Sequence, residues 1–211
     1  LGYGPYHKTS GILNSIIRFD TAWIGINYFS FALSKKPYMG IGRNLAYTKE
    51  AYLSVDGFKS HHSLASGDDD LFIQEIAAKK TVAIEISEDA HTTSEVAQSW
   101  KDWVYQKRRH LSASPLYKDK FKILLAIYPL AQLLFLLSLV FLMCLKTYFM
   151  YIIVLLVLRL LISYIVNYKI MKRLNVYDLY WLHPLYEVVN LVIQGNFVLL
   201  NLFSKPQKWS R

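Results

Sequence analysis

Three long apolar runs occupy the second half of the chain. The first covers residues 123–145 without one charge, and the second covers 147–168 with Arg159 as its only charge. The third run, 184–203, is interrupted by residues that include Glu187, Asn190, Gln194, Gly195 and Asn196. A helix of about 20 apolar residues spans the roughly 30 Å hydrocarbon core of a bilayer. The first two runs predict transmembrane helices, and the third predicts a full span or a re-entrant or interfacial helix.

Shorter periodic segments, separated by turns, make up the first half. Apolar positions at helical spacing predict a helix over 12–34, and 49–55 predicts a short second helix. The glycine-rich stretch 38–47 predicts a strand that enters a tight turn, and the β-branched run 81–87 predicts another strand. Residues 68–80 begin with acidic and end with basic side chains, which complement the dipole of a helix.

An amphipathic helix is predicted over 95–111, just before the first apolar run. Its tryptophans, Trp100 and Trp103, share one face, and a basic cluster follows at its end. Such a helix is typical of a membrane interface. We therefore divide the chain into residues 1–117, a soluble part with this helix, and 118–211, the membrane region.

The distribution of charge adds a topology to this picture. The chain is 54% hydrophobic with a net charge of +9, and its excess of lysine and arginine flanks the apolar runs. By the positive-inside rule, residues 1–122 and the 169–182 loop lie in the cytoplasm, and Lys146 lies outside. The charge thus indicates topology and contact with anionic lipids, and nucleic acid is not an expected partner.

Arg159 and Glu187 are the ionisable residues well inside the apolar runs. A charge left in hydrocarbon costs at least about 2.5–3.5 kcal/mol, so we expect both to face the interior of the helix bundle. The two can pair only if Arg159 extends inward, because it lies about nine residues above the 169–182 loop whereas Glu187 lies only a few residues past it. The competing partners for Glu187 are then Lys169, Lys172 and Arg173.

The cations on both sides of the third run do not decide whether it crosses the membrane. Lys205, Lys208 and Arg211 follow it and balance the cations that precede it. The single cysteine, Cys144, lies in the first apolar run, so neither a disulfide framework nor a thiolate metal site can form.

The acidic run at 66–70, Ser-Gly-Asp-Asp-Asp, is the sharpest chemical feature of the first half. Adjacent carboxylates at a helix start can hold one of them ready as a general base. Taken alone, however, the run favours ordinary capping and dipole chemistry. A calcium loop is less favoured still, because the alternating acidic positions of an EF-hand and its distal glutamate are missing.

Two further features carry possible anion chemistry. The stretch 106–110, Gln-Lys-Arg-Arg-His, offers guanidinium groups that suit phosphate oxygens, although alone it favours a topogenic, lipid-binding patch. The stretch 40–44, Gly-Ile-Gly-Arg-Asn, would let backbone amides approach a ligand closely, although alone it favours a plain β-turn.

In this order and spacing, the three stretches resemble the second half of a glycosyltransferase family 2 catalytic domain. The matching motifs are the glycine-rich segment, a helix ending in a Gly-Gly-Phe-like turn, the acidic motif and a Gln-x-x-Arg-Trp helix, and membrane helices follow them. The resemblance covers roughly residues 36–115 by motif. It implies an α/β fold, a partial Rossmann-like GT-A domain, followed by an α-helical transmembrane region.

The resemblance also implies roles for individual residues. Asp68 and Asp69 match the acidic pair, and Asp69 would be the general base that deprotonates the acceptor. Gln106 and Arg109 match the Gln and Arg of Gln-x-x-Arg-Trp, so Arg109 would lie near the departing diphosphate and Gln106 near the acceptor. The remaining residues expected to bind diphosphate or acceptor are Arg108, His110, Gly42, Arg43 and Asn44.

Several positions depart from the family pattern. His110 replaces the tryptophan that would stack on a sugar in processive synthases, which weakens the expectation of processive synthesis. Asp56 replaces the first glycine of the turn. The chain opens at Leu1 as though cut from the middle of a domain, without the Asp-x-Asp half. We therefore expect Mg²⁺ or Mn²⁺ to be bound mainly by sequence outside this chain, no metal ligand within it, and no activity from the chain alone.

The favoured function is an inverting glycosyltransferase that moves a sugar from a nucleotide sugar to a lipid-linked or glycan hydroxyl. The expected location is an integral membrane protein of a bacterial inner membrane, with its catalytic part in the cytoplasm and in contact with lipid. The alternative is a non-enzymatic membrane module with a basic lipid-binding helix. A transporter ranks third, because few intramembrane charges offer a pathway.

Overall fold

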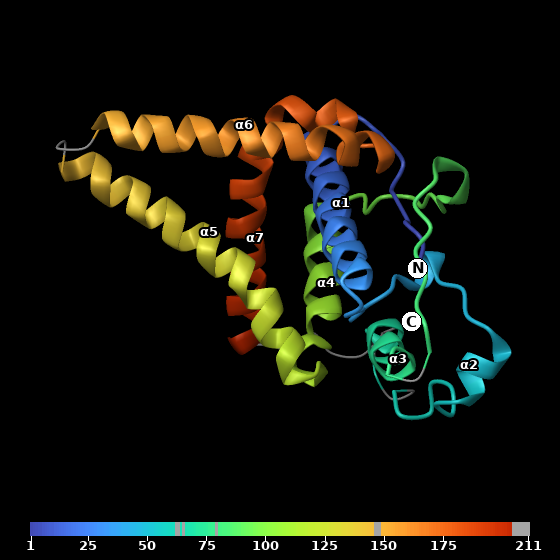
Figure 1. Ribbon diagram of the computed structural model, residues 1–211. Coiled ribbons are helices and arrows are strands. Elements are labelled where there is room, and N and C mark those ends of the chain that lie inside the picture. The colour runs from blue at the N-terminus through green and yellow to red at the C-terminus, as the bar shows by residue number, and fades with distance from the viewer. Residues whose placement is uncertain (62–63, 65, 79, 146–148, 204–211) are drawn as a thin grey trace.

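The computed structural model describes residues 1–61, 64, 66–78, 80–145 and 149–203 (Figure 1). Helices dominate these residues. The α-helices are α1 (Ile12–Leu33), α2 (Lys49–Leu53), α3 (Asp68–Ile76), α4 (Trp100–Leu111), α5 (Asp119–Leu145), α6 (Phe149–Arg173) and α7 (His183–Phe203). Short 3-10 turns are η1 (Gly42–Asn44), η2 (Glu88–Ala90), η3 (Ser114–Leu116) and η4 (Tyr177–Leu182).

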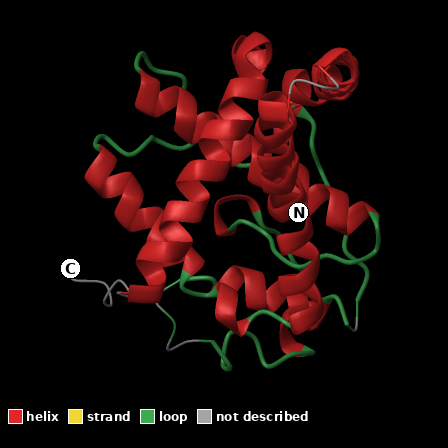
Figure 2. Ribbon diagram, turned by 90° about the vertical axis from the view of Figure 1, so that its left-hand side faces the viewer, coloured by secondary structure: helices red, strands yellow, loops and turns green. Residues whose placement is uncertain are grey.

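The expected α/β, Rossmann-like GT-A fold is wrong. The described part of the chain holds helices joined by loops, with no strand or sheet (Figure 2). Residues 81–87 are extended, but their pairing with the start of the chain includes only two short bonds, from Leu1 N to Ala83 O and from Glu85 N to Leu1 O (2.7 and 2.8 Å). A sheet needs a continuous ladder of such bonds.

A side-chain amide satisfies backbone carbonyl groups that a neighbouring strand would otherwise satisfy. The amide of Asn44 donates to the carbonyl oxygens of Tyr3 and Ala90, at 2.7 Å each. Only one isolated parallel bridge, between Tyr6 and Ser94, is present among the described residues. The backbone groups of these extended segments therefore find partners without forming strands.

The helix predictions for the first half are largely confirmed. α1 occupies all but the last residue of the predicted 12–34. α2 ends at Leu53, two residues short of the predicted 49–55, and Asp56 in the turn that follows adopts a positive φ of 56°. α4 begins at Trp100 rather than at residue 95, because the Ser99 side chain caps it by accepting from Asp102 N at 3.2 Å.

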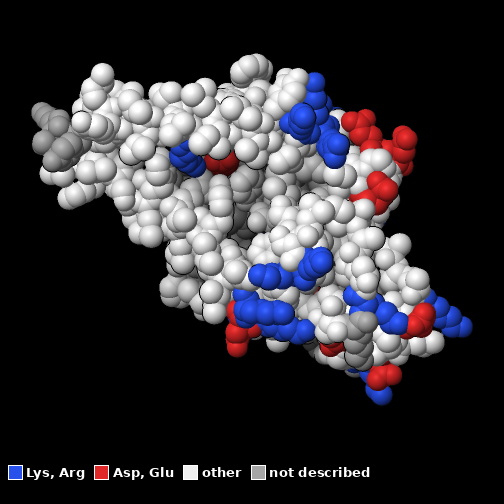
Figure 3. Space-filling view, in the orientation of Figure 1, with Lys and Arg blue, Asp and Glu red and all other residues white. Residues whose placement is uncertain are grey.

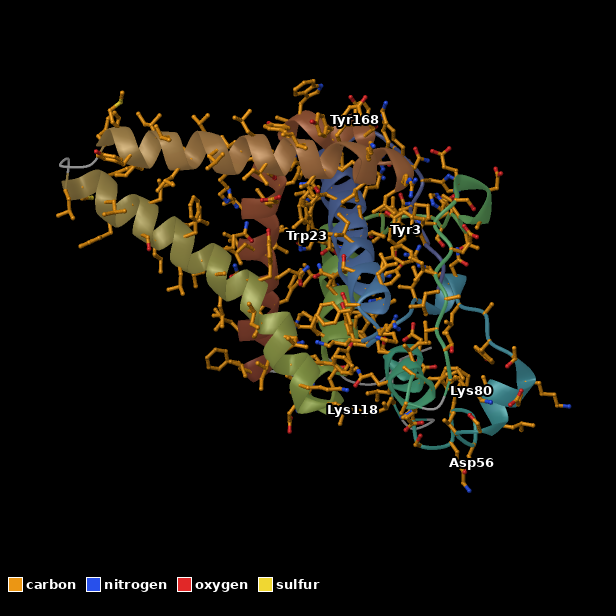
Figure 4. The ribbon with its side chains drawn as sticks, in the orientation of Figure 1. Tyr3, Trp23, Asp56, Lys80, Lys118 and Tyr168 are labelled. Carbon is orange, nitrogen blue, oxygen red and sulfur yellow. The ribbon has the colours of Figure 1, made fainter. Side chains whose placement is uncertain are left out.

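We call the described residues outside the α5 and α6 helices the body. α1, α4 and α7 lie side by side and form its centre (Figure 1). Trp103 of α4 is almost fully buried and packs edge-to-face on Phe197 of α7, with ring centroids 5.5 Å apart. Ile17 of α1 joins the same apolar cluster. Figure 4 shows Trp23 on the side of α1 that faces α5 and α7, and its ring lies 5.2 Å from that of Tyr128.

Buried charged side chains form ion pairs and hydrogen bonds between these helices. Lys107 of α4 pairs with Asp20 of α1 at 2.8 Å, and both side chains are at most 10% exposed. Gln194 of α7 donates to the other oxygen of Asp20 at 2.6 Å. Arg18 donates two bonds to Asp178 in η4, at 2.8 and 2.7 Å. Specific polar contacts therefore join α1 to α4, α7 and η4.

α5 and α6 form a hairpin that projects from the body (Figure 1). Both are long and apolar enough to cross a membrane, and α7 together with η4 also meets that criterion of length and composition. Of the described residues of the hairpin, only Phe121, Gln132, Ile152 and Met171 are buried. On the face drawn in Figure 3, the projecting part of the hairpin is free of charge except for one basic and one acidic patch that adjoin beneath α6, and further basic patches lie where the hairpin meets the body.

The expectation for Arg159 and Glu187 is confirmed. Arg159 donates to Glu187 at 3.4 Å, and the Glu187 side chain is only 5% exposed. The Arg159 guanidinium also lies over the ring of Phe135, 4.7 Å from its centroid. Four cations named above, Lys146, Lys205, Lys208 and Arg211, lie outside the described residues.

Candidate active site

The glycine-rich turn and the acidic motif meet directly. Gly42 N in η1 donates to Asp69 Oδ2 at 2.7 Å, and Asp69 Oδ1 accepts from the Asp70 N–H at 3.1 Å. A Cβ on Gly42 would lie 3.3 Å from Asp69 Oδ2, so a side chain there would crowd the carboxylate. These contacts fix one position for the Asp69 carboxylate at the start of α3.

Gly67 sets the direction in which α3 begins. Its φ is +85°, and a Cβ added there would lie 2.2 Å from the Cβ of Ala113. Only glycine combines that backbone angle with so close an approach. The start of α3 is thereby held against the turn that follows α4 (Figure 1).

The three aspartates have different environments. Asp68 is exposed, Asp69 is half-buried and Asp70 is buried. Burial raises the pKa of Asp69, and the charge of Asp68 adds to the effect, whereas the bond from Gly42 opposes it. A half-buried carboxylate with a raised pKa is a stronger base than one in water.

Asp70 is a buried carboxyl group rather than a solvent-facing cap. Its Oδ2 accepts a hydrogen bond from the Tyr117 hydroxyl, and its Oδ1 has no hydrogen-bond partner among the described residues. Burial raises the pKa of Asp70 well above its ordinary value, and the charges of Asp69 and Asp68 raise it further. A proton held on Asp70 removes one negative charge from the neighbourhood of Asp69.

Tyr6 links the glycine-rich turn to α4. Gln106 Nε2 donates to the Tyr6 hydroxyl at 3.1 Å, and the Arg43 guanidinium lies over the Tyr6 ring at 4.2 Å. Arg43 also donates to the carbonyl oxygen of Pro5 at 3.4 Å. Gln106 and Arg43, which lie far apart in sequence, are therefore on either side of one tyrosine.

His110 experiences the charges around it. Desolvation by surrounding protein, followed by the cations Lys107, Arg109 and Arg43, lowers the pKa of its imidazole to about 4, although His110 is an exposed residue. His110 is therefore neutral at pH 7. The effect of Arg43 and Arg109 on one ring indicates that η1 and the end of α4 lie near each other.

Arg108 and Asn44, which were expected to bind ligand, instead connect separate parts of the fold. Arg108 Nε donates to Asn201 Oδ1 at 2.9 Å, and Asn201 donates back to the Arg108 carbonyl at 3.0 Å, so this arginine joins α4 to α7. The amide of Asn44 donates to two backbone carbonyls, as described above. Gly42, Arg43, Asp69, Gln106, Arg109 and His110 thus remain as the group around η1, α3 and α4.

A divalent cation does not fit the described residues. They contain no group of three or more histidine, cysteine, aspartate or glutamate side chains able to hold a metal ion. Asp69 already has both oxygens in hydrogen bonds from backbone amides. No step below therefore passes through a metal.

Two residues of the site were missed by the sequence analysis. Tyr6 and Tyr117 bond to Gln106 and Asp70 respectively. The chain has 16 tyrosines, and nothing in the neighbouring residues marks these two. Their roles follow only from the fold, which brings the start of the chain to α4 and the start of α5 to α3.

One comparison with known proteins gave a match. A family model described as "Glycosyl transferase family group 2" matches residues 2–186. No curated protein and no solved structure matches. The matched residues include η1, α3 and α4, which carry the group described above, and continue through α5 and α6 into the start of α7. The chain belongs to glycosyltransferase family group 2.

Proposed function

We propose that this chain carries the acceptor side of an inverting glycosyltransferase site at a membrane surface. The donor is a nucleotide sugar, and the acceptor is a hydroxyl of a lipid-linked molecule or a glycan. By the positive-inside rule, residues 1–117 lie on the cytoplasmic side, which for a bacterial protein is that of the inner membrane. Mg²⁺ or Mn²⁺, if the reaction uses one, is bound mainly by sequence outside this chain.

The chemistry is a single displacement at the anomeric carbon. The acceptor oxygen forms a bond to that carbon as Asp69 takes the hydroxyl proton, and the bond from the carbon to the diphosphate oxygen breaks. The diphosphate leaves with the electron pair, and Arg109 stabilises the charge that gathers on it. Gln106 orients the acceptor, and neutral His110 accepts or donates a hydrogen bond without adding charge.

The observation that carries the proposal is the bond from Gly42 N to Asp69 Oδ2. It joins the two motifs that the family would place around the acceptor, and it holds a half-buried carboxylate whose pKa is raised. Such a carboxylate has the properties of a general base. A capping aspartate would instead be exposed to solvent and would accept from its own helix alone.

The test compares Asp69→Asn with Asp70→Asn in the full-length protein. Membranes are given a panel of uridine and guanosine diphosphate sugars, and the released nucleoside diphosphate is measured. Loss of the base should reduce release by roughly 10²–10⁴-fold. Asp70→Asn should keep most of the activity, because an amide oxygen can still accept from Tyr117. Binding of the nucleoside diphosphate itself should be unchanged in both variants.

Retained turnover in Asp69→Asn would overturn the assignment and make Asp68→Asn the next variant to measure. Equal losses in both variants would show that the acidic run matters for folding rather than for proton transfer. If the wild-type protein releases no diphosphate from any donor yet binds anionic vesicles, the lipid-binding module becomes the better interpretation.

A further inference from the structure

α7 differs from α5 and α6 in its direction. It runs across α6 rather than beside it, and the views in Figures 1 and 2 agree on this. Among the α-helices, α7 packs mainly on α4 and α1. It meets α6 near its first turns, where Ser163 bonds to His183 at 2.8 Å. A third helix of a transmembrane bundle would instead pack along its neighbours.

α7 has one polar face, and that face points into the protein. Its contacts on this face include Glu187 with Arg159, Gln194 with Asp20, and Asn201 with Arg108. The complete stripe follows helical spacing and consists of His183, Glu187, Asn190, Gln194, Phe197 and Asn201. These side chains contact α1, α4 and α6, so most polar residues of the third apolar run serve the body. Asn196 is the exception, because it is exposed and donates to Val192 O of α7 itself at 2.7 Å.

The opposite face of α7 is apolar except for Asn196, and it is exposed. Leu185, Val192 and Leu199 follow one another at seven-residue intervals and are 59%, 58% and 55% exposed. Phe203 continues the stripe and is 88% exposed. A contiguous apolar face of this length marks an interaction surface.

The helix packed along α7 excludes an orientation through the hydrocarbon core. α4 carries Lys101, Asp102 and Arg108, and its Trp103 packs on Phe197 near the end of α7. If α7 crossed the bilayer, α4 would enter it as well. Each charge at the centre of the core would cost about 2.5–3.5 kcal/mol or more.

The cations around the hairpin agree with two crossings. Lys118, Lys120 and Lys122 at the start of α5 are exposed, and Lys172 and Arg173 end α6. Figure 4 shows Lys118 and Tyr168 at the base of the hairpin, next to the body. In the sequence, Lys205, Lys208 and Arg211 follow α7. With two crossings all of these lie on one side, as the positive-inside rule favours, whereas a third crossing would move the last three to the other.

We infer that α7 lies in the plane of the membrane, with its apolar face immersed in the acyl chains of the leaflet next to residues 1–117. The partner of this face is lipid, because the face adjoins the apolar hairpin that crosses the same leaflet. Helices of this kind sink about 5–10 Å into the boundary between headgroups and acyl chains.

The test measures depth along α7 in the full chain, in liposomes of phosphatidylethanolamine and phosphatidylglycerol. Cys144 is replaced by serine, and single cysteines at Leu185, Val192 and Leu199 each receive a nitroxide. Collision rates with oxygen and with a water-soluble nickel complex give their depths. For an in-plane helix the three depths agree within about 5 Å, one helical turn. For a spanning helix, Leu185 and Leu199 differ by about 21 Å along the axis.

Two positions on α6 provide the matched control. Leu155 and Ile162 are also exposed and seven residues apart, and their depths should differ by up to about 10 Å because α6 crosses the bilayer. Protection of all three α7 positions from both collision partners would instead mean that a protein covers the face. Either that result or a steady change of depth along α7 overturns the inference.

A second measurement does not depend on nitroxide chemistry. In sealed vesicles, cysteines at Lys118 and at Ser210, which lies outside the described residues, are treated with a membrane-impermeant maleimide. Two crossings require that both react from the same side. Reaction from opposite sides would establish a third crossing and overturn the inference. Neither measurement uses catalysis, so their outcome is separate from that of the Asp69 variants.

Discussion

α6 and α7 are two apolar helices of similar length with opposite surroundings. Only Ile152 and Met171 of α6 are buried, and most of its other side chains are exposed. α7 buries a stripe in which polar side chains outnumber apolar ones. Composition alone makes both of them candidate spans. The comparison shows that the stripe of polar residues in the apolar helix α7 marks the face that contacts the rest of the protein.

The same contrast divides the whole molecule. The body holds charged groups in buried pairs, such as Asp20 with Lys107, whereas the described residues of the hairpin present apolar side chains outward. Substitutions in the body should therefore change the free energy of unfolding strongly. Substitutions on the outer surface of the hairpin should change it little, because detergent or lipid solvates that surface in both states.

The largest expected effect follows from removing one partner of the buried pair. Lys107→Met leaves Asp20 charged and buried, which should reduce the free energy of unfolding by roughly 3–5 kcal/mol. The measurement is thermal unfolding of the full-length protein in detergent. Lys122→Met is the control, since its bond to Asp119 is exposed and should be worth less than about 1 kcal/mol. Equal losses would contradict the contrast between body and surface.

A smaller loss is expected from Gly67→Ala. The positive φ and the contact with Ala113 should together cost about 1–3 kcal/mol. The matched control is Gly195→Ala in α7, where an added Cβ meets nothing within 4 Å. Because alanine favours a helix by about 1 kcal/mol over glycine, that variant should be neutral or slightly stabilising. A tolerated alanine at 67 would mean that α3 does not depend on this turn.

Asp70 should make stability depend on pH. The pKa of Asp70 in the folded state lies well above its ordinary value of 3.8, which applies to the unfolded state. At a pH between these two pKa values, the folded state holds a proton that the unfolded state has lost. The free energy of unfolding should therefore fall as pH rises, by at most about 1.4 kcal/mol per pH unit. Asp69, whose pKa is also raised, contributes in the same direction, and Asp68 and Tyr117 are the other titratable groups near it.

Asp70→Asn should remove most of this slope while preserving the hydrogen bond from Tyr117. Unfolding curves of wild type and variant between pH 4 and 8 provide the measurement. A variant whose slope matches that of the wild type would show that Asp70 is ionised in the folded protein.

The smallest effect is expected on the outer surface of the hairpin. Ile162→Ala on α6, where the side chain is 53% exposed, should change the free energy of unfolding by less than about 0.5 kcal/mol. Ile17→Ala on α1, where the side chain is 1% exposed, should cost about 2–5 kcal/mol. Unfolding of both variants in the same detergent gives the comparison, and a large loss at Ile162 would mean that protein covers α6.

Periodicity in the sequence was enough to predict α1 and the two helices of the hairpin, because spacing and length determine such elements directly. The acidic motif and the glycine-rich turn could also be found, since their residue types are unusual where they stand. The α/β fold could not be predicted correctly. It was inferred from resemblance, whereas residues 81–87 find partners that do not extend into a ladder.

The sequence by itself determined which segments are apolar, where the cations lie, and to which family the chain belongs, because these depend on local composition and order. Only the tertiary structure decided that Asp70 is buried, that Tyr6 joins Gln106 to Arg43, and that the polar stripe of α7 faces the body. Those features depend on contacts between residues far apart in the chain, whose burial and direction no local pattern specifies.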